Sequence, residues 1–188
     1  YSNDTATAST RGPLSEGDYV LTATGNASSG YFGGLAPGWG RTRVDRIDYS
    51  NDTATASPRG PLTAGRYSLS ATSSRESGVP TENIVNYAAG TYATPNTGYF
   101  GGHSTPGYFS SLGRIDYSND TATASARGPL TLAKNGYSAV SNNSEFGYFG
   151  GGYGSSYLST VDRIDYLNDV TIALVKGPLS FARAHLTA

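Results

Sequence analysis

Short segments rich in β-branched residues, or alternating between apolar and polar residues, recur along this chain between clusters of glycine, proline and asparagine. In one group of such segments, residues 160–165 and 121–125 are the clearest strand predictions. Residues 137–140 and 147–150 supply two further short strands. No helical period extends across the glycines. The pattern therefore predicts an all-β fold built from groups of four short strands.

The chain is also an internal repeat. A phrase that reads Arg-Ile-Asp-Tyr-Ser-Asn-Asp-Thr-Ala-Thr-Ala-Ser around Tyr117 has copies around Tyr1, Tyr49 and Tyr166, each followed by Gly-Pro-Leu at a constant distance. A second phrase, Gly-Tyr-Phe-Gly-Gly, begins at Gly30, Gly98 and Gly147. We expect one repeat array over residues 1–188. Its units are predicted at residues 1–48, 49–116 with an insertion at about 73–96, 117–165, and 166–188 as a partial copy.

A single four-stranded sheet cannot bury both of its faces, so these units need neighbours. Radial stacking of such sheets gives a β-propeller, in which each sheet, or blade, covers the next. This chain would supply about three and a half blades, whereas closed propellers have about four to eight. The chain lacks methionine and opens in mid-phrase at Tyr1, which favours a fragment of a longer or processed polypeptide. We expect the missing strands to come from sequence outside this chain or from another copy in a homo-oligomer.

Composition excludes several function classes. The formal net charge of −1, without blocks of like charge, argues against nucleic-acid binding. The sequence contains no run of 18 apolar residues, which argues against membrane insertion. Cysteine is absent, which removes disulfides and thiolate chemistry. The two histidines, His103 and His185, lie at non-equivalent places without metal-ligand spacing or a serine elbow. We therefore expect no enzymatic activity, no cofactor and no metal, although scattered glutamates leave a polysaccharide-degrading propeller as an alternative.

The order of the phrases resembles the kelch repeat. The matching residues are a glycine pair, a strand ending in Asp-Tyr, a turn, a Pro-Leu and an Ala-Arg, found here at Gly150-Gly151, Ile164-Asp165-Tyr166, Asn168-Asp169, Gly177-Pro178-Leu179 and Ala182-Arg183. The resemblance implies kelch-like blades of four strands. Two features depart from it: small residues such as Thr123 and Ala124 replace the usual tryptophan of the fourth strand, and the Ala-Arg occurs once.

The wording of the repeat, Asp-Tyr-Ser-Asn-Asp-Thr-Ala-Thr-Ala-Ser with Gly-Tyr-Phe-Gly-Gly-Gly, also resembles repeats of virion structural or tail-fibre proteins of marine and cyanobacterial tailed phages. This resemblance implies a place on a virion or an extracellular surface. Its implied partners are other virion or scaffold proteins or a surface glycan. The kelch resemblance alone leaves an intracellular, cytoplasmic scaffold for protein interactions as the alternative.

The most conspicuous charged feature is the repeated Arg-Ile-Asp. Residues two apart lie on the same face of a strand, so each pair can meet directly or clasp the neighbouring blade. We expect these residues to form structural ion pairs rather than a ligand-binding ring; they are Arg46 and Asp48, Arg114 and Asp116, and Arg163 and Asp165. A second set of cations recurs at Arg11, Arg59, Arg127 and Lys176, where solvated loop charges, or cations that bind local carbonyls, are favoured over an anion site.

Aromatic residues in loops are the best candidates for binding. Loops of constant length but different content follow the Gly-Gly phrase, and they carry Trp39, Tyr108, Phe109, Tyr153 and Tyr157. The insertion adds Tyr87 and Tyr92. Such rings can stack on sugars or anchor a protein interface, or they can cap the blades. The sequence therefore predicts a non-enzymatic structural or adhesion propeller that contacts a carbohydrate or a protein through its loops.

Overall fold

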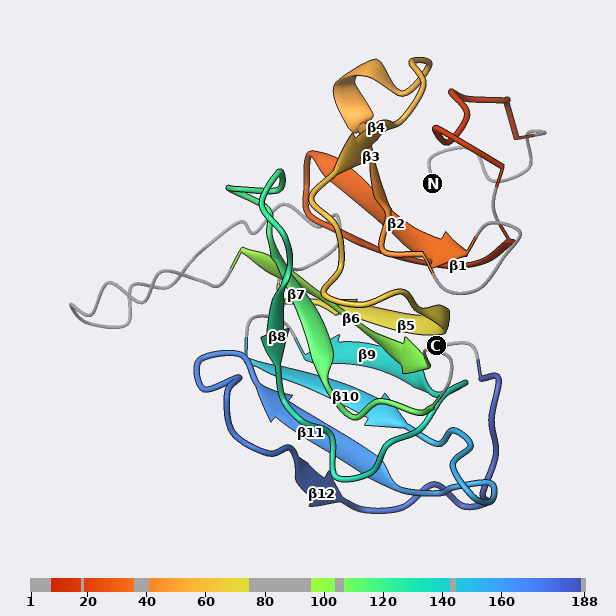
Figure 1. Cartoon of the computed structure of the whole chain (residues 1–188), viewed down its shortest axis with the longest axis vertical. Helices are drawn as coiled ribbons and strands as arrows, with labels where there is room; N and C mark the ends of the chain where they lie inside the picture. The colour runs from red at the N-terminus through yellow and green to blue at the C-terminus, as the bar shows by residue number, and fades with distance from the viewer. Residues whose placement is uncertain are drawn as a thin grey trace.

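The computed structural model of the chain describes residues 8–17, 19–35, 41–74, 96–103, 107–142 and 145–186. Within these ranges the chain forms three four-stranded antiparallel sheets, each a meander of consecutive strands (Figure 1). The first sheet holds β1 (Tyr19–Gly25), β2 (Ser29–Leu35), β3 (Val44–Asp48) and β4 (Ser57–Arg59). A 3-10 turn, η1 (Tyr49–Asn51), follows β3. The predicted all-β fold is confirmed.

The second and third sheets repeat this order. The second holds β5 (Tyr67–Ser73), β6 (Thr97–His103), β7 (Leu112–Asp116) and β8 (Ser125–Arg127). The third holds β9 (Ser138–Asn142), β10 (Phe146–Gly150), β11 (Val161–Asp165) and β12 (Leu174–Lys176). Each sheet runs from a first to a fourth strand, so the sheets are offset from the units predicted from the tyrosine phrase.

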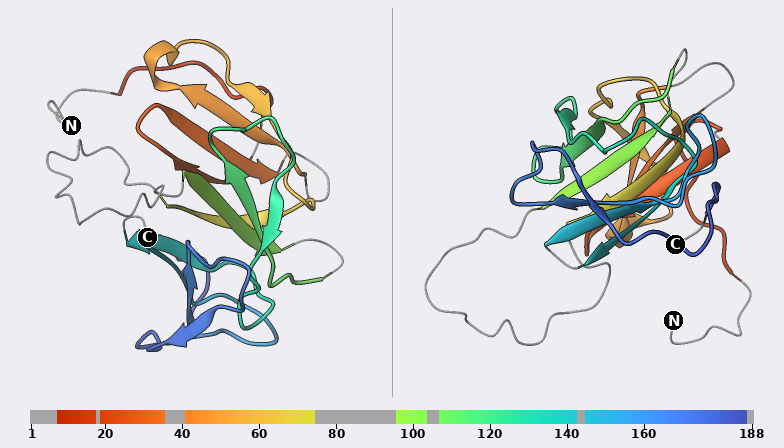
Figure 2. Two further views of the ribbon diagram at one scale, coloured as in Figure 1. Left: turned by 90° about the vertical axis from the view of Figure 1, so that its left-hand side faces the viewer. Right: turned by 90° about the horizontal axis from the view of Figure 1, so that it is seen from below.

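The three sheets follow one another along the array (Figure 2). Strand β1 packs beside β5, and β5 beside β9, so the first strands of successive sheets are neighbours. In the described part of the chain the sheets form an open series and do not close into a ring. In that same part, no helix is long and apolar enough to cross a membrane.

The turn before the fourth strand is longer than the sequence indicated. The sequence predicts a strand at residues 121–125, but β8, the fourth strand of the second sheet, begins only at Ser125. The amide of Asn119 donates to the carbonyl of Asp116, and the amide of Ala122 donates to the carbonyl of Asn119. These bonds keep Thr121 and Ala122 in the turn, so the alternating Thr-Ala-Thr-Ala segment is mostly turn.

Apolar side chains from adjacent sheets form two cores. The core between the first and second sheets includes Tyr31, Phe100 and Tyr117, and that between the second and third includes Phe149 and Tyr166. Tyrosines stack across both junctions: Tyr31 and Tyr117 lie 4.6 Å apart between ring centroids, and Tyr99 and Tyr166 lie 5.1 Å apart. Tyrosine and phenylalanine thus fill the space between sheets that have no tryptophan in their fourth strands.

The first glycine of the Gly-Tyr-Phe phrase makes room for these rings. A Cβ added at Gly98 would collide with the hydroxyl of Tyr117, and one at Gly147 would lie 2.8 Å from the hydroxyl of Tyr166. Each tyrosine therefore lies flat across a glycine of its own sheet before it stacks on the previous sheet. This close approach explains why the phrase opens with glycine.

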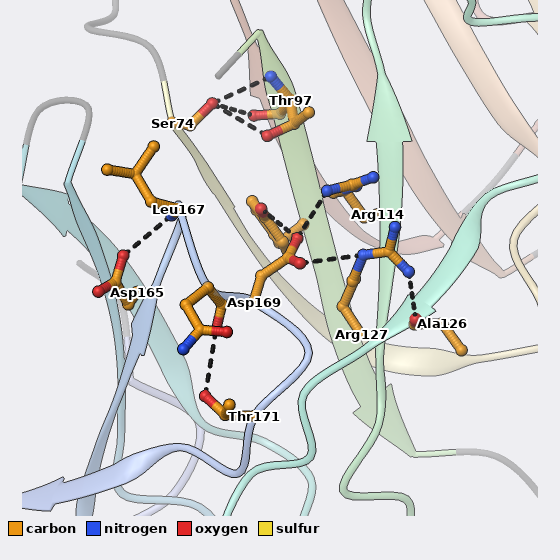
Figure 3. A network of polar contacts seen from close by, with 11 residues as sticks. Ser74, Thr97, Arg114, Ala126, Arg127, Asp165, Leu167, Asp169 and Thr171 are labelled. Carbon is orange, nitrogen blue, oxygen red and sulfur yellow. Dashed lines mark hydrogen bonds and ion pairs between the residues drawn. The ribbon is translucent and has the colours of Figure 1, made fainter. Parts of the chain in front are cut away.

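The insertion joins the first two strands of the second sheet. Ser73 ends β5 and Thr97 begins β6, while residues 75–95 lie outside the described ranges. The base of this connection is tied together, because the Ser74 hydroxyl lies 3.0 Å from the Thr97 hydroxyl and also accepts from the Thr97 amide at 3.0 Å (Figure 3). In the first sheet the same connection is a tight turn, in which the Asn26 side chain accepts from the amides of Ser28 and Ser29.

Candidate functional site

A single aspartate joins the second sheet to the first. Asp120 lies in the turn after β7, and its Oδ2 accepts hydrogen bonds of 2.8 Å from the Tyr31 hydroxyl and from Nη1 of Arg46. Nε of Arg59 lies 3.2 Å from the same oxygen. The two hydrogen-bond donors and the third, ion-paired residue come from β2, β3 and β4 of the first sheet. One carboxylate from one sheet is thus held by three strands of its neighbour.

The same arrangement recurs at the next junction. Asp169 of the third sheet accepts from Tyr99 and from Nη1 of Arg114 at 2.8 Å each, and Nε of Arg127 lies 3.0 Å from its other oxygen (Figure 3). We call this constellation of a tyrosine, two cations and the aspartate of the next sheet the aspartate clasp. Both clasp carboxylates are more than nine-tenths buried. An ion pair so shielded from water resists screening by salt.

Backbone hydrogen bonds accompany each clasp. The amide of Gly60 donates to the carbonyl of Asp120 at 2.7 Å, and the amide of Ala124 donates to the carbonyl of Pro61 at 2.8 Å. The third sheet repeats both bonds, from Gly128 to Asp169 and from Ala173 to Pro129, at 2.9 and 2.8 Å. The Gly-Pro-Leu phrase therefore leaves its own sheet to bind the next one, which explains its constant spacing from the tyrosine.

Burial adjusts the acidity of the clasp tyrosines. Burial, reinforced by the hydrogen bond to Asp120 and by that carboxylate's charge, raises the pKa of Tyr31 to about 12. Burial also raises the pKa of Tyr99, which donates to Asp169. Each hydroxyl consequently keeps its proton at physiological pH and remains a donor to the aspartate.

The arginine and the aspartate of Arg-Ile-Asp have different partners. Arg46 and Arg114 bind the clasp aspartates of the following sheet. The sequence left open whether each arginine pairs within its own phrase or with the neighbouring sheet, and both residues contact the neighbouring sheet. The aspartates of the same phrases instead close the local turns. The exposed Asp48, for example, accepts a hydrogen bond from the amide of Ser50 at 2.9 Å. The same role falls to Asp116 with Ser118, and to Asp165 with Leu167. Direct pairing within the phrase does not occur, because each turn offers nearer amide donors.

Three members of the second set of cations have carboxylate partners, whereas Lys176 is exposed. Arg59 and Arg127 complete the two clasps, and Nε of Arg11 lies 3.1 Å from Asp52, the counterpart of Asp120 in the first sheet. Arg59 and Arg127 are therefore not solvated loop charges, and Arg127 also donates to the carbonyl of Ala126 at 3.0 Å, in line with the alternative of binding to local carbonyls. Their equivalent positions reflect a shared contact with the next turn.

Three of the aromatic candidates come together at one surface. Tyr108 from the loop between β6 and β7 lies edge-on to Tyr153 from the loop between β10 and β11, with ring centroids 6.4 Å apart. Tyr153 in turn lies 5.4 Å from Tyr157, again edge-on. We call these residues the tyrosine cluster. Their exposed fractions are 38%, 37% and 62%, so the rings contact one another and still present surface to solvent.

Backbone hydrogen bonds hold the loop that carries two of these tyrosines. Tyr153 and Asn135 exchange amide-to-carbonyl bonds of 2.8 and 3.0 Å, and the amide of Leu158 donates to the carbonyl of Gly152 at 2.9 Å. The loop is thereby fixed against the segment that enters β9. A surface ordered in this way loses little further conformational entropy when it binds.

The remaining aromatic candidates are not part of this surface. Phe109 is half-buried, and the guanidinium of Arg66 lies 5.5 Å from the centre of its ring. Arg66 is itself buried, and burial lowers its pKa. This contact gives Phe109 a packing role. Trp39, Tyr87 and Tyr92 lie outside the described residues.

An open groove of about 500 Å³ runs along the first strands of all three sheets. Its walls include Leu21, Leu69 and Ala139, and residues His185 and Leu186 lie at its margin. Its lining combines leucine and alanine side chains with serine, threonine and backbone. The repeat phrases give no sign of this groove because none of them lies in the first strands.

A buried ion pair in the third sheet was also not anticipated. Nζ of Lys134 lies 2.9 Å from Oδ2 of Asp162, and neither side chain is exposed to solvent. Thr131 donates a further hydrogen bond to Asp162. The repeat gives little indication of this pair, because the position equivalent to Asp162 holds an aspartate, Asp45, in the first sheet but a glycine, Gly113, in the second.

These features define an array of antiparallel sheets joined by aspartate clasps and bearing an exposed tyrosine cluster. No group of three or more histidine, aspartate or glutamate side chains in the described ranges is arranged to hold a metal ion. No protein-family model matches the sequence, and no curated protein matches it significantly.

Proposed function

We propose that the chain is a non-enzymatic adhesion module that binds a surface glycan through the tyrosine cluster. The observation that carries this proposal is the meeting of Tyr108, Tyr153 and Tyr157, from loops of two different sheets, at one exposed surface. Their ring faces are suited to stack on the apolar faces of sugar rings, while their hydroxyl groups can bond sugar hydroxyls.

The surroundings of the cluster favour a neutral, hydroxyl-rich ligand. The loop between Tyr153 and Tyr157 consists of Gly154, Ser155 and Ser156, and both serines are exposed. Small residues leave the ring faces accessible, and serine hydroxyls add donors and acceptors beside them. The cluster itself contains no charged side chain that would demand an ionic partner.

The scaffold in this proposal is a propeller of kelch-like blades. Two observations support a radial arrangement: each junction repeats the same clasp, and the first strands of all three sheets line one groove. A radial scaffold brings the loops between second and third strands to one end of the array. That placement accounts for a cluster made by two neighbouring blades.

The proposed location is a virion or another extracellular surface. It rests on the resemblance of the repeat phrases to phage virion and tail-fibre repeats. In that setting other virion proteins are further partners, and glycan binding would attach the particle to a host envelope.

The test is to measure equilibrium binding of the purified chain to a host envelope polysaccharide and to a panel of neutral oligosaccharides. We expect saturable binding that Tyr157→Ala weakens at least about tenfold, the size typical of losing an aromatic anchor. Phe181→Ala is the matched control, because Phe181 is an aromatic residue with 71% exposure outside the cluster. Equal effects of both variants, or the absence of saturable binding, would contradict the proposal. Sustained release of reducing ends would favour the polysaccharide-degrading alternative.

A further inference from the structure

The third sheet carries a set of clasp donors that no other sheet in the described residues engages. Tyr148 pairs with Arg163 across β10 and β11, as Tyr99 pairs with Arg114 and Tyr31 with Arg46. Lys176 lies opposite Val161 in β12, as Arg127 lies opposite Leu112 in β8. The positions of a complete clasp donor set are therefore present, with lysine in place of one arginine.

Within the described ranges these donors have no carboxylate partner. The guanidinium of Arg163 lies 4.0 Å from the ring centre of Phe146 in its own sheet, and a hollow of about 310 Å³ opens beside it. Lys176 is exposed, whereas Arg59 and Arg127 are only about one-fifth exposed. This face of the third sheet is thus positively charged and open.

The backbone of the third sheet shows the same unfilled contact. A Cβ added at Gly12 or Gly60 would collide with the carbonyl of Ala54 or Ala122 in the turn that each glycine meets. A Cβ added at Gly177, the counterpart of these glycines, would meet nothing within 4 Å; at Gly128, which donates to the carbonyl of Asp169, the nearest atoms belong to the second sheet itself. The amide of Gly177 and the carbonyl of Pro178 therefore lie where a following turn would bind.

The opposite end of the array presents the complementary residues. Tyr49 is 53% exposed, although its counterparts Tyr117 and Tyr166 are 7% and 3% exposed because the preceding sheet covers them. The Asp52 side chain is 41% exposed, against less than one-tenth for the two clasp aspartates. In the described residues, Arg11 is its one cationic partner.

We propose that the third sheet of one copy binds the first sheet of a second copy head to tail. Tyr148, Arg163 and Lys176 of one copy would hold Asp52 of the other, and Tyr49 would stack on Tyr148. This contact would repeat the clasp geometry already present at two junctions within the chain. It is independent of the glycan-binding proposal.

A second copy is the fitting occupant because the open half-site of the third sheet and the exposed half-site of the first sheet are complementary in charge, in ring stacking and in backbone pairing. Gly177 and Pro178 would replace Gly12 and Pro13, which now bond the carbonyl of Asp52 and the amide of Ala56. The displaced Arg11 contact is an exposed ion pair, of the kind that contributes little to stability. A contact between two different faces builds a ring if its rotation closes and a filament if it does not.

The test combines two charge reversals. The donor-face variant carries Arg163→Glu with Lys176→Glu, and the acceptor-face variant carries Asp52→Lys; Arg183→Glu is the control, an exposed charge near the same end. Sedimentation of the unaltered chain across a concentration series should show association. Each of the two variants should weaken this association by about a hundredfold or more, as expected when a buried charge pair between partners is broken. The control should associate normally.

Mixing supplies the decisive measurement. The donor-face and acceptor-face variants each retain one intact half-site, and their reversed half-sites are complementary in charge to each other, so an equimolar mixture should associate although neither variant does so alone. Circular dichroism and thermal unfolding of each variant should match the unaltered chain, which separates lost association from lost folding. A chain that stays monomeric at every concentration, or association insensitive to both charge reversals, would overturn the proposal.

Discussion

Arg114 and Asp169 belong to different sheets, and their Nη1 and Oδ2 atoms lie 2.8 Å apart. The same carboxylate also accepts a hydrogen bond from the buried Tyr99. One aspartate therefore fixes the position of its turn against a strand of the preceding sheet. Because Asp120 repeats these contacts with Arg46 and Tyr31, the relative placement of successive sheets is set by a recurring polar contact as well as by apolar packing.

Loss of a clasp carboxylate should destabilise the chain much more than loss of a turn carboxylate. We expect Asp120→Ala to lower the free energy of unfolding by about 2–4 kcal/mol, because Tyr31 and Arg46 would keep buried donors without an acceptor. Asp116→Ala in the same turn is the matched control. It removes an exposed acceptor for the amide of Ser118 and should cost about 0.5–1 kcal/mol. Urea denaturation of both variants measures the difference, and equal losses would show that the clasp contributes no more than a local turn.

The sequence alone places three of the four strands predicted between residues 121 and 165. Strands β9, β10 and β11 begin and end within two residues of the predicted segments, because glycine and asparagine punctuate them and their interiors suit a pleated surface. The fourth strand was misplaced. Alternation of threonine and alanine looks like a strand, but the hydrogen bonds from Asn119 and Ala122 extend the turn through that segment.

Contacts between sheets were harder to predict than the sheets themselves. The repeated Arg-Ile-Asp showed that these charges serve every unit, but spacing alone could not decide whether Arg46 meets Asp48 or a residue 74 positions away. The tyrosine cluster could not be predicted as a unit either, because Tyr108 and Tyr153 come from loops of different sheets. Closure into a ring depends on the rotation between sheets, which the residues of a single unit do not determine.

The chain should lose stability above pH 10. Burial raises the pKa of Tyr31 to about 12 and also raises the pKa values of Tyr99, Tyr117, Tyr137 and Tyr166. In the unfolded chain these phenols ionise near pH 10, so above that pH the unfolded state binds fewer protons than the native state and stability falls as pH rises. Each such tyrosine adds about 1.4 kcal/mol per pH unit to this fall until its folded pKa is reached.

Unfolding free energies between pH 8.5 and 11, with tyrosinate absorbance followed in parallel, measure this effect. Below pH 10 the tyrosine contribution should be fully present and constant. Tyr166→Phe should make the alkaline loss shallower by removing one titrating group. Native-state titration of these tyrosines near pH 10 would contradict the expectation.

Replacing one member of the buried pair of Lys134 and Asp162 should destabilise the chain strongly, whereas replacing both together should destabilise it much less. Either Lys134→Met or Asp162→Leu leaves an unpaired charge in the core, and we expect a loss of about 3–5 kcal/mol for each. Replacing both with apolar residues removes the charges together, so the double variant should be more stable than either single variant. A double-mutant cycle by chemical denaturation measures the coupling, and strictly additive losses would show that the two groups do not stabilise each other.

A kink at the start of each first strand gives the last prediction. Val20, Ser68 and Gly136 occupy equivalent positions and have positive φ values of 56°, 49° and 59°. This left-handed conformation costs a non-glycine residue about 1–2 kcal/mol, and a branched side chain such as that of Val20 tolerates it poorly. Val20 is 48% exposed, so its replacement removes little buried surface.

Val20→Gly should therefore stabilise the chain by about 0.5–1 kcal/mol, after the added flexibility of the unfolded glycine is subtracted. Gly136→Ala tests the reverse change and should destabilise by about 1–2 kcal/mol, because it imposes the strain and places a Cβ 3.2 Å from the His185 ring. Thermal unfolding of both variants beside Ala23→Gly, a glycine replacement elsewhere in β1, provides the comparison. Stabilisation by Ala23→Gly as large as that by Val20→Gly would mean that relief of the kink is not the cause.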